Sequence, residues 1–140
     1  MNSMKQILIL VVLILPLIGY SQYSKDSIDI KCEQCMSLDS NSSTNSMVSC
    51  VGIAQEEWTI KMNKYYRLLS DSLSGESVKL LYHTQEVWLN YKKAQISYLI
   101  SFYHSDMIGG NHLERSVEIK NLIRERALDL KIQYDNFKEE

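Results

Sequence analysis

Three cysteines near the start of the chain are the residues whose spacing most readily supports chemistry. Cys32 and Cys35 form a Cys-x-x-Cys pair, and Cys50 follows on the far side of a polar stretch. A bridge from Cys50 to Cys35 or to Cys32 would close a loop of roughly 15 to 19 residues, worth about 3 kcal/mol in the chain-entropy model. The pair alone also fits a redox dithiol, although no strand-rich context surrounds it, and zinc would need a fourth ligand. We therefore expect one disulfide, with its pairing open and one cysteine left over.

The other side chains that could do chemistry lack a fixed arrangement. His104 and His112, with Asp106 between them, could meet a metal or act as acid–base groups. His83 is the only other histidine. Five carboxylates could pair for hydrolysis, but on amphipathic helices they are typical of a solvated face: Glu56, Glu57, Glu114, Glu118 and Glu125. Since the sequence also has no serine-centred elbow and no glycine-rich phosphate loop, it does not favour an enzyme, and we expect no cofactor or metal.

The first 21 residues have the composition of a secretion signal. Lys5 supplies the positive charge, an apolar run covers Ile7 to Ile18, and Gly19-Tyr20-Ser21 offers small residues for cleavage. The run is about 12 residues long, whereas a permanent membrane helix needs about 20. An uncleaved anchor is the alternative. We expect export to the periplasm or the medium, cleavage near Ser21-Gln22, and no permanent membrane span.

Cleavage at that point leaves 119 residues, enough for one compact domain. The mature chain keeps 14 basic and 17 acidic side chains, so its formal charge is −3. This balance argues against nucleic-acid binding, which depends on basic patches. It is compatible with a cationic protein partner.

Three long segments of the mature chain have the apolar spacing of helices, and none alternates like a strand. The first runs from about Ser46 to Leu73, with Thr44 or Asn45 as a cap, and Ser74-Gly75 ends it. Its apolar face comprises Met47, Cys50, Ala54, Trp58, Met62, Tyr65, Leu69 and Leu73. The second, opening at Glu76 or Ser77, has a face of Leu81, Thr84, Trp88, Tyr91, Gln95, Tyr98 and Phe102. The third, capped by Asn111, has a face of Leu113, Val117, Lys120, Ile123, Ala127, Leu130, Tyr134 and Phe137.

These segments predict an all-α fold, a small up-down-up bundle of three main helices behind an N-terminal loop tied by the disulfide. We expect a signal peptide at 1–21, an arm and loop at 22–45, loose over Gln22 to Ile30, and a helical domain at 46–138. The tryptophans and tyrosines serve as core; an exposed aromatic patch that grips a partner is the alternative. The amides of Asn63, Gln85 and Gln95 fix the packing of helices or contact a ligand.

Four motifs, in order, resemble the lysozyme inhibitor LprI-like N-terminal domain family, also called DUF1311. The family has a cysteine before a helix that ends in Leu-Asn-x-x-Tyr, matched by Cys50 and by Met62-Asn63-Lys64-Tyr65-Tyr66. Its Leu-x-x-x-Gln-x-x-Trp-x-x-Tyr-Arg-x-Ala element is matched by Leu81, Gln85, Trp88, Tyr91, Lys92 and Ala94. A glycine pair and an Arg-x-x-x-Leu element are matched by Gly109, Gly110, Asn111, Arg126 and Leu130. The resemblance covers about Cys35 to Leu130.

The chain departs from the family pattern in two places. Many members carry a second cysteine pair, where this chain has Ile96 and Ser116-Val117, so that bridge is absent. Lys92 replaces an arginine and lacks its planar pair of donors.

The resemblance implies an exported helical domain that binds and inhibits lysozyme, with Ser37 to Ser46 or Ser105 to His112 as the projecting loop. The alternatives are an envelope module that binds another protein without lysozyme activity, and an enzyme acting on cell-wall material. The sequence does not indicate an oligomeric state.

Overall fold

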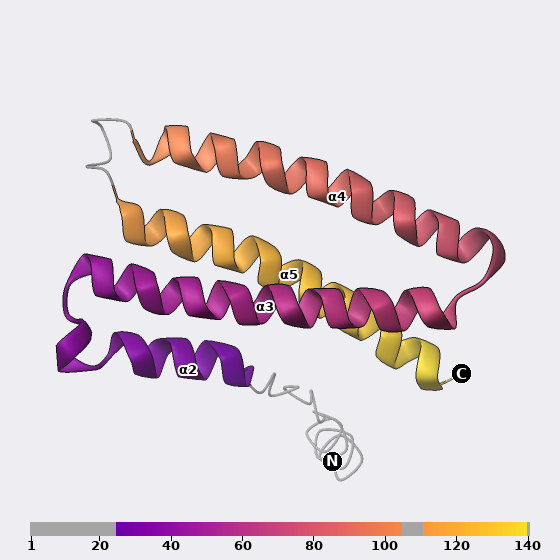
Figure 1. Cartoon of the computed structure of the whole chain (residues 1–140), viewed down its shortest axis with the longest axis horizontal. Coiled ribbons are helices and arrows are strands. Elements are labelled where there is room, and N and C mark those ends of the chain that lie inside the picture. Colours follow the sequence, from indigo (N-terminus) through magenta and orange to yellow (C-terminus); the bar gives the residue numbers. More distant parts are fainter. Residues whose placement is uncertain (1–24, 105–110, 140) are drawn as a thin grey trace, which may run out of the picture.

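The computed structural model describes residues 25–104 and 111–139. Within them lie a short helix α2 (Ser27–Met36), a 3-10 turn η1 (Asp39–Asn41) and three long helices, α3 (Thr44–Ser72), α4 (Gly75–Phe102) and α5 (His112–Glu139). Figure 1 shows α3 and α5 crossing at the centre, with α4 along one side and α2 along the other. The all-α bundle is confirmed. The predicted signal peptide, Asp106 and the Gly109-Gly110 pair lie outside the described residues.

The core lies where α3, α5 and α2 meet. Trp58, Val51 and Leu130 are fully buried at its centre. The faces expected for α3 and α5 are the packed ones, apart from Phe137 at the end of α5, which is exposed, because apolar side chains three and four residues apart share one side of a helix. The cluster of buried residues comprises Ile28, Cys32, Val51, Ala54, Trp58, Met62, Leu69, Leu81, Ile123, Ala127 and Leu130.

The N-terminal arm is not loose from Ser27 onward, so that part of the prediction is wrong. Asp26 caps α2 by accepting a hydrogen bond from the amide of Ile28 at 3.1 Å. Ile28 and Cys32, one helical turn apart, are both buried against α3. Ten residues with two buried apolar positions form a helix here because tertiary packing supplies the stability that so short a segment lacks.

The helix ends agree with the expected boundaries to within two or three residues. The cap of α3 is Ser43, whose hydroxyl accepts from the amide of Ser46 at 3.2 Å, and not Thr44 or Asn45. Asn111 accepts from the amide of Glu114 at 3.4 Å, as expected of a cap for α5. Gly75 has a φ of +59°, a conformation that side chains rarely adopt, and it lets the chain reverse between α3 and α4.

The packing face of α4 is rotated from the expected one. Leu81, Gln85 and Leu99 are its buried residues, and Trp88 packs against the core while half-buried. Four residues of the expected face are exposed instead: Thr84, Tyr91, Tyr98 and Phe102. A tyrosine-rich apolar row of α4 therefore faces solvent.

Candidate functional site

A row of carboxylates runs along the exposed side of α5. It consists of Glu114, Glu118, Glu125 and Asp129, which we call the acidic stripe. Intervals of four, seven and four residues place them on one face of the helix, and all four are exposed. Only Asp129 has an ion-pair partner in the described part of the chain, Arg126, at 2.8 Å. The stripe is thus a negatively charged surface that is largely free to meet a cation.

A groove between α4 and α5 borders the acidic stripe. Its open volume is about 280 Å³. Tyr91, Gln95 and Leu99 line it from α4, and Glu118, Asn121, Leu122 and Glu125 line it from α5. The groove therefore places two amides and two carboxylates beside the ring of Tyr91, a mainly polar lining such as the rim of a protein interface has.

Tyr103, the buried residue that follows α4, fixes one carboxylate of the stripe. Its hydroxyl donates a hydrogen bond to Glu118. That bond, with burial and the nearby Glu114 charge, raises the pKa of Tyr103 to about 12, so the phenol stays a donor at neutral pH. The ring lies edge-on to Phe102 at 5.2 Å between centroids. The bond holds the end of α4 against α5 beside the groove.

Gln85, from the tryptophan motif, joins three helices. Its Oε1 accepts a hydrogen bond from Nε of Arg126 on α5 at 3.0 Å, and its Nε2 lies 4.0 Å from the sulfur of Met62 on α3. Arg126 and Gln85, which come from two different family motifs, are therefore in direct contact. Their geometry favours the packing interpretation of the amide over a ligand contact.

The remaining motif residues are spread over the molecule. Trp88 is half-buried, with the ammonium of Lys92 5.3 Å from its ring centroid, a contact that needs no guanidinium fork. The ring of Tyr66 lies 6.2 Å from that of Tyr82. Asn63 is exposed in a shallow hollow on α3, and Leu130 is fully buried.

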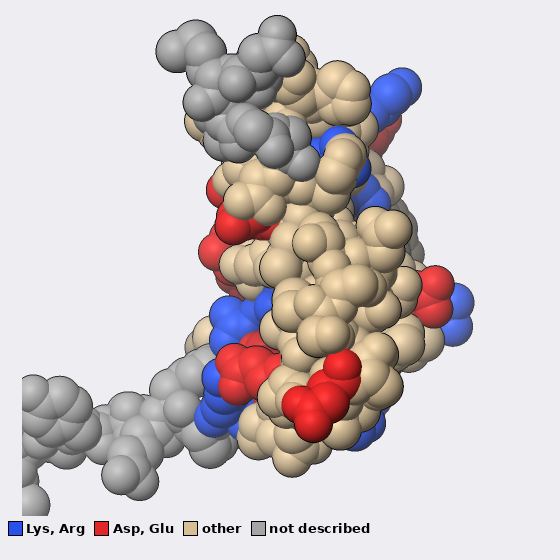
Figure 2. Space-filling view, turned by 90° about the vertical axis from the view of Figure 1, so that its left-hand side faces the viewer, with Lys and Arg blue, Asp and Glu red and all other residues tan. Residues whose placement is uncertain are grey.

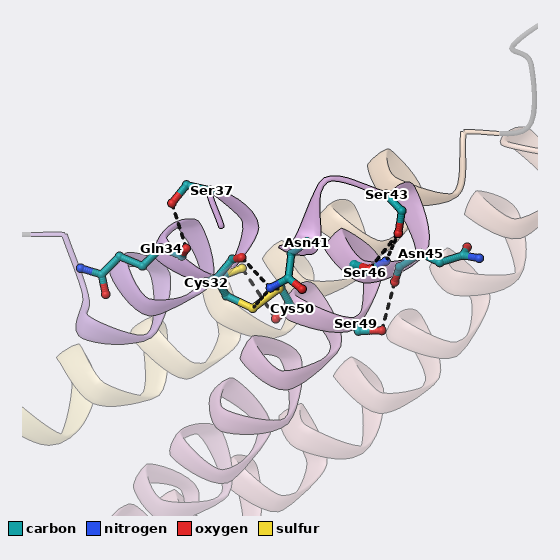
Figure 3. The surroundings of a disulfide bond; sticks show 10 residues. Cys32, Gln34, Ser37, Asn41, Ser43, Asn45, Ser46, Ser49 and Cys50 are labelled. Carbon is teal, nitrogen blue, oxygen red and sulfur yellow. Dashed lines mark hydrogen bonds between the residues drawn. A yellow bond between two sulfur atoms is a disulfide. The ribbon is translucent and has the colours of Figure 1, made fainter. Parts of the chain in front are cut away.

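The disulfide joins Cys35, at the end of α2, to Cys50 in α3. Figure 3 shows the side chain of Asn41 directed at the bridge, and its amide donates to the carbonyl of Cys35 at 2.9 Å. Residues 37–43 are thereby held as a short loop around η1, and the rest of the expected loop is the start of α3. Cys32 is the free cysteine, and it is buried.

Asp29 holds α2 against the other helices by a buried ionic contact. Its carboxylate accepts hydrogen bonds from Nε of Arg124 at 2.6 Å, from Nζ of Lys120 at 3.5 Å and from the indole of Trp58 at 3.2 Å. Beside it, Lys61 forms an ion pair with Asp26. The two carboxylates and three cations of this cluster are paired within it, so its role is structural.

The histidine hypothesis is tested only in part. The rings of His104 and His112 lie 6.4 Å apart between centroids, and both residues are exposed. Arg115 donates to Nδ1 of His112 at 3.0 Å. His83 lies apart from them, exposed on α4. In the part of the chain that the structure describes, no group of three or more histidine, cysteine or acidic side chains could hold a metal ion.

Charged side chains are unevenly distributed on the end of the bundle at which α4 ends and α5 begins. Figure 2 shows this end with an uncharged centre, and acidic side chains gathered at one side and at the lower edge. None of the helices described is long and apolar enough to cross a membrane.

Comparison with known proteins gives one family and one fold. The model of the family described as lysozyme inhibitor LprI matches residues 35–130. No curated protein matches the chain. Among solved structures, an uncharacterized protein from Burkholderia thailandensis is similar, with a TM-score of 0.75 and 22% identity over 82% of this chain and 57% of that one. That likeness shows the fold alone, and this chain spans little more than half the length of the relative.

Proposed function

Because the chain belongs to the lysozyme inhibitor LprI family, we propose that its mature form is an exported, non-catalytic domain that binds and inhibits lysozyme. The observation that carries this proposal is the acidic stripe of α5 beside the groove. Lysozymes are generally cationic, so an acidic surface attracts them and speeds their association. The fold supports the proposal because both helices of the site are fixed to one core.

The two parts of this site would have different tasks. The carboxylates of Glu114 and Glu125 are exposed and lie at the edge, where charges steer a partner and set its orientation. The amides of Gln95 and Asn121 lie in the groove, where they would hydrogen-bond a bound partner. Inhibition then follows if the bound domain covers the cleft in which lysozyme holds its polysaccharide.

This assignment replaces the projecting loop expected from the sequence. The Ser37 to Ser46 segment is tied down by the disulfide and carries a single acidic residue, Asp39. The other loop, Ser105 to His112, lies mostly outside the described residues. The stripe and groove are the described surface whose charge is complementary to a cationic protein.

Binding of the mature domain to lysozyme, measured calorimetrically at low salt, tests the proposal. Glu114→Gln with Glu125→Gln removes two exposed charges of the stripe and leaves the Tyr103 contact intact. With each exposed charge worth about 0.7 kcal/mol, the affinity should fall about tenfold. The loss should shrink at high salt, which screens exposed charges.

The matched control is Glu56→Gln with Glu86→Gln, which makes the same change of charge at two exposed glutamates of α3 and α4. The affinity should be nearly unchanged. Equal losses in both double variants would show that only net charge matters. Equal binding of a cationic protein without lysozyme activity would instead favour a general envelope module.

A further inference from the structure

Helix α4 is apolar on more sides than its packing uses. It carries eight of the 14 exposed large hydrophobic side chains of the described residues: Leu80, Tyr82, Val87, Leu89, Tyr91, Tyr98, Ile100 and Phe102. A helix with apolar residues around most of its circumference is typical of a buried position. In the single chain only the side of Leu81, Gln85 and Leu99 is buried.

The exposed residues include one continuous row that we call the α4 stripe. It consists of Leu80, Thr84, Val87, Tyr91, Ala94, Tyr98 and Phe102. The intervals are four, three, four, three, four and four residues, the spacing of a seam between two packed helices. All seven residues are exposed, and none carries a charge. The row therefore has the pattern of a helix interface, and none of the described helices packs along it.

We propose that a second copy of this chain covers the α4 stripe, with the two α4 helices antiparallel about a two-fold axis at Tyr91. The outer positions of the row are symmetric about Tyr91, as a two-fold interface requires. Leu80 and Phe102 lie 11 positions before and after Tyr91, and are thus opposite each other in the pair. Thr84 lies opposite Tyr98, since both are seven positions from the axis, whereas Val87 and Ala94, four and three positions from it, are offset by one residue. At Thr84 and Tyr98 a smaller side chain meets a larger one, which lets the two helices approach there.

The exposed area is sufficient for such a pair. Aromatic side chains can bury roughly 150–250 Å² each, so the three in the stripe, 41% to 57% exposed, offer on the order of 300 Å² per copy. Leu80 and Val87 are 55% and 52% exposed and extend the patch. The whole stripe spans about 33 Å of helix. Together with the exposed residues beside it on α4, the area of the stripe approaches the roughly 800 Å² that each partner buries in a specific interface.

The absence of charge favours a second copy over a cationic partner. An uncharged row pairs with itself without repulsion, whereas a cationic protein gains nothing electrostatic from it. The acidic stripe of α5 is a separate set of residues. The dimer and the lysozyme contact can therefore be tested by different substitutions, Tyr91 being the one residue near both.

The first experiment is sedimentation of the mature chain over a range of concentrations. The wild type should be a dimer that dissociates on dilution, and Val87→Glu should be monomeric because it buries charge in the seam. The control is Leu89→Glu. Leu89 lies outside the α4 stripe, on another side of the helix, and its exposure of 45% is close to the 52% of Val87. The control variant should remain dimeric. Circular dichroism checks that both variants keep their helices.

Two results would overturn the proposal. One is a wild type that stays monomeric up to about 1 mM. The other is the same oligomeric state in the Val87 and Leu89 variants. A Val87→Glu chain that stays dimeric but loses lysozyme binding would assign the stripe to lysozyme instead. If the monomeric variant still binds lysozyme, the dimer surface of α4 and the lysozyme surface of α5 are distinct.

Cross-linking tests the orientation of the helices. In the antiparallel pair Tyr91 meets its own copy, so Tyr91→Cys should give a covalent dimer under mild oxidation. Leu80 should lie about 33 Å from its copy, so Leu80→Cys should give none. The wild type, whose Cys32 is buried, measures the background. Cross-linking of both variants, or of neither, would contradict the antiparallel pair.

Discussion

Replacing Asp29 with asparagine should be among the most destabilising single changes to the electrostatics of this domain. The asparagine keeps the shape of the side chain and can still accept from Trp58. It removes the charge that Arg124 meets at 2.6 Å and Lys120 at 3.5 Å. Two cations would then remain, poorly solvated, without the carboxylate that accepts their hydrogen bonds.

The magnitude follows from how much water each group can reach. The side chain of Asp29 is 8% exposed, that of Lys120 12% and that of Arg124 26%. Removing one partner of a fully buried ion pair costs 3–5 kcal/mol, and since Arg124 can partly rehydrate, we expect about 3 kcal/mol. For a domain of this size that loss lowers Tm by roughly 10 °C.

The assay is urea and thermal unfolding of the mature domain, monitored by circular dichroism. Asp129→Asn is the matched control, because Asp129 also pairs with an arginine, at 2.8 Å, but is 52% exposed. An exposed pair of this kind should contribute less than about 0.5 kcal/mol. Equal losses in the two variants, or no loss in the first, would refute the view that burial of Asp29 makes its charge important.

Three further predictions concern the cysteines and the acid limb of stability. Reducing the Cys35–Cys50 bridge should lower the free energy of unfolding by about 3 kcal/mol, and an unchanged urea midpoint with reductant would contradict this. Burial raises the pKa of the Cys32 thiol, so alkylation should be slow in the folded protein and fast in urea; similar rates would count against it. Burial alone would raise the pKa of Asp26, but the Lys61 hydrogen bond, with an amide bond and nearby cations, lowers it overall. Its stabilisation is present above the unfolded-state pKa and is lost as pH falls through the lower folded-state value. Asp26→Asn should therefore flatten the stability profile below about pH 4, and an unaltered profile would exclude this.

The packing faces of α3 and α5 could be predicted from the sequence because each has one apolar row. Trp58 and Ala127 stand in such rows, and both are fully buried. The carboxylates of α5 were also predicted correctly as a solvated face. Their spacing of four, seven and four residues indicates that they lie on one face of the helix.

Helix α4 was harder because it has two competing rows. The row with Tyr91, Tyr98 and Phe102 is more apolar than the row that is buried, which contains an amide, Gln85. The amide is buried because Arg126, 41 residues away, satisfies it. The spacing of apolar residues along a helix does not reveal a contact between residues so distant in sequence.

The α2 segment was missed for a related reason. Its two buried apolar residues, Ile28 and Cys32, are too few to show a period. Asp29 meets Lys120 and Arg124 only after the chain has folded back from α5. Local propensity says little about a short helix that depends on tertiary contacts.

A lysis assay shows whether the domain inhibits lysozyme. Purified mature domain is mixed with lysozyme, and the clearing of a cell-wall suspension is followed at low salt. Lysis should slow as the domain is added, and the variant with Glu114→Gln and Glu125→Gln should need about tenfold more protein for the same effect. Undiminished lysis at a large excess of folded wild-type domain would contradict the proposed inhibition.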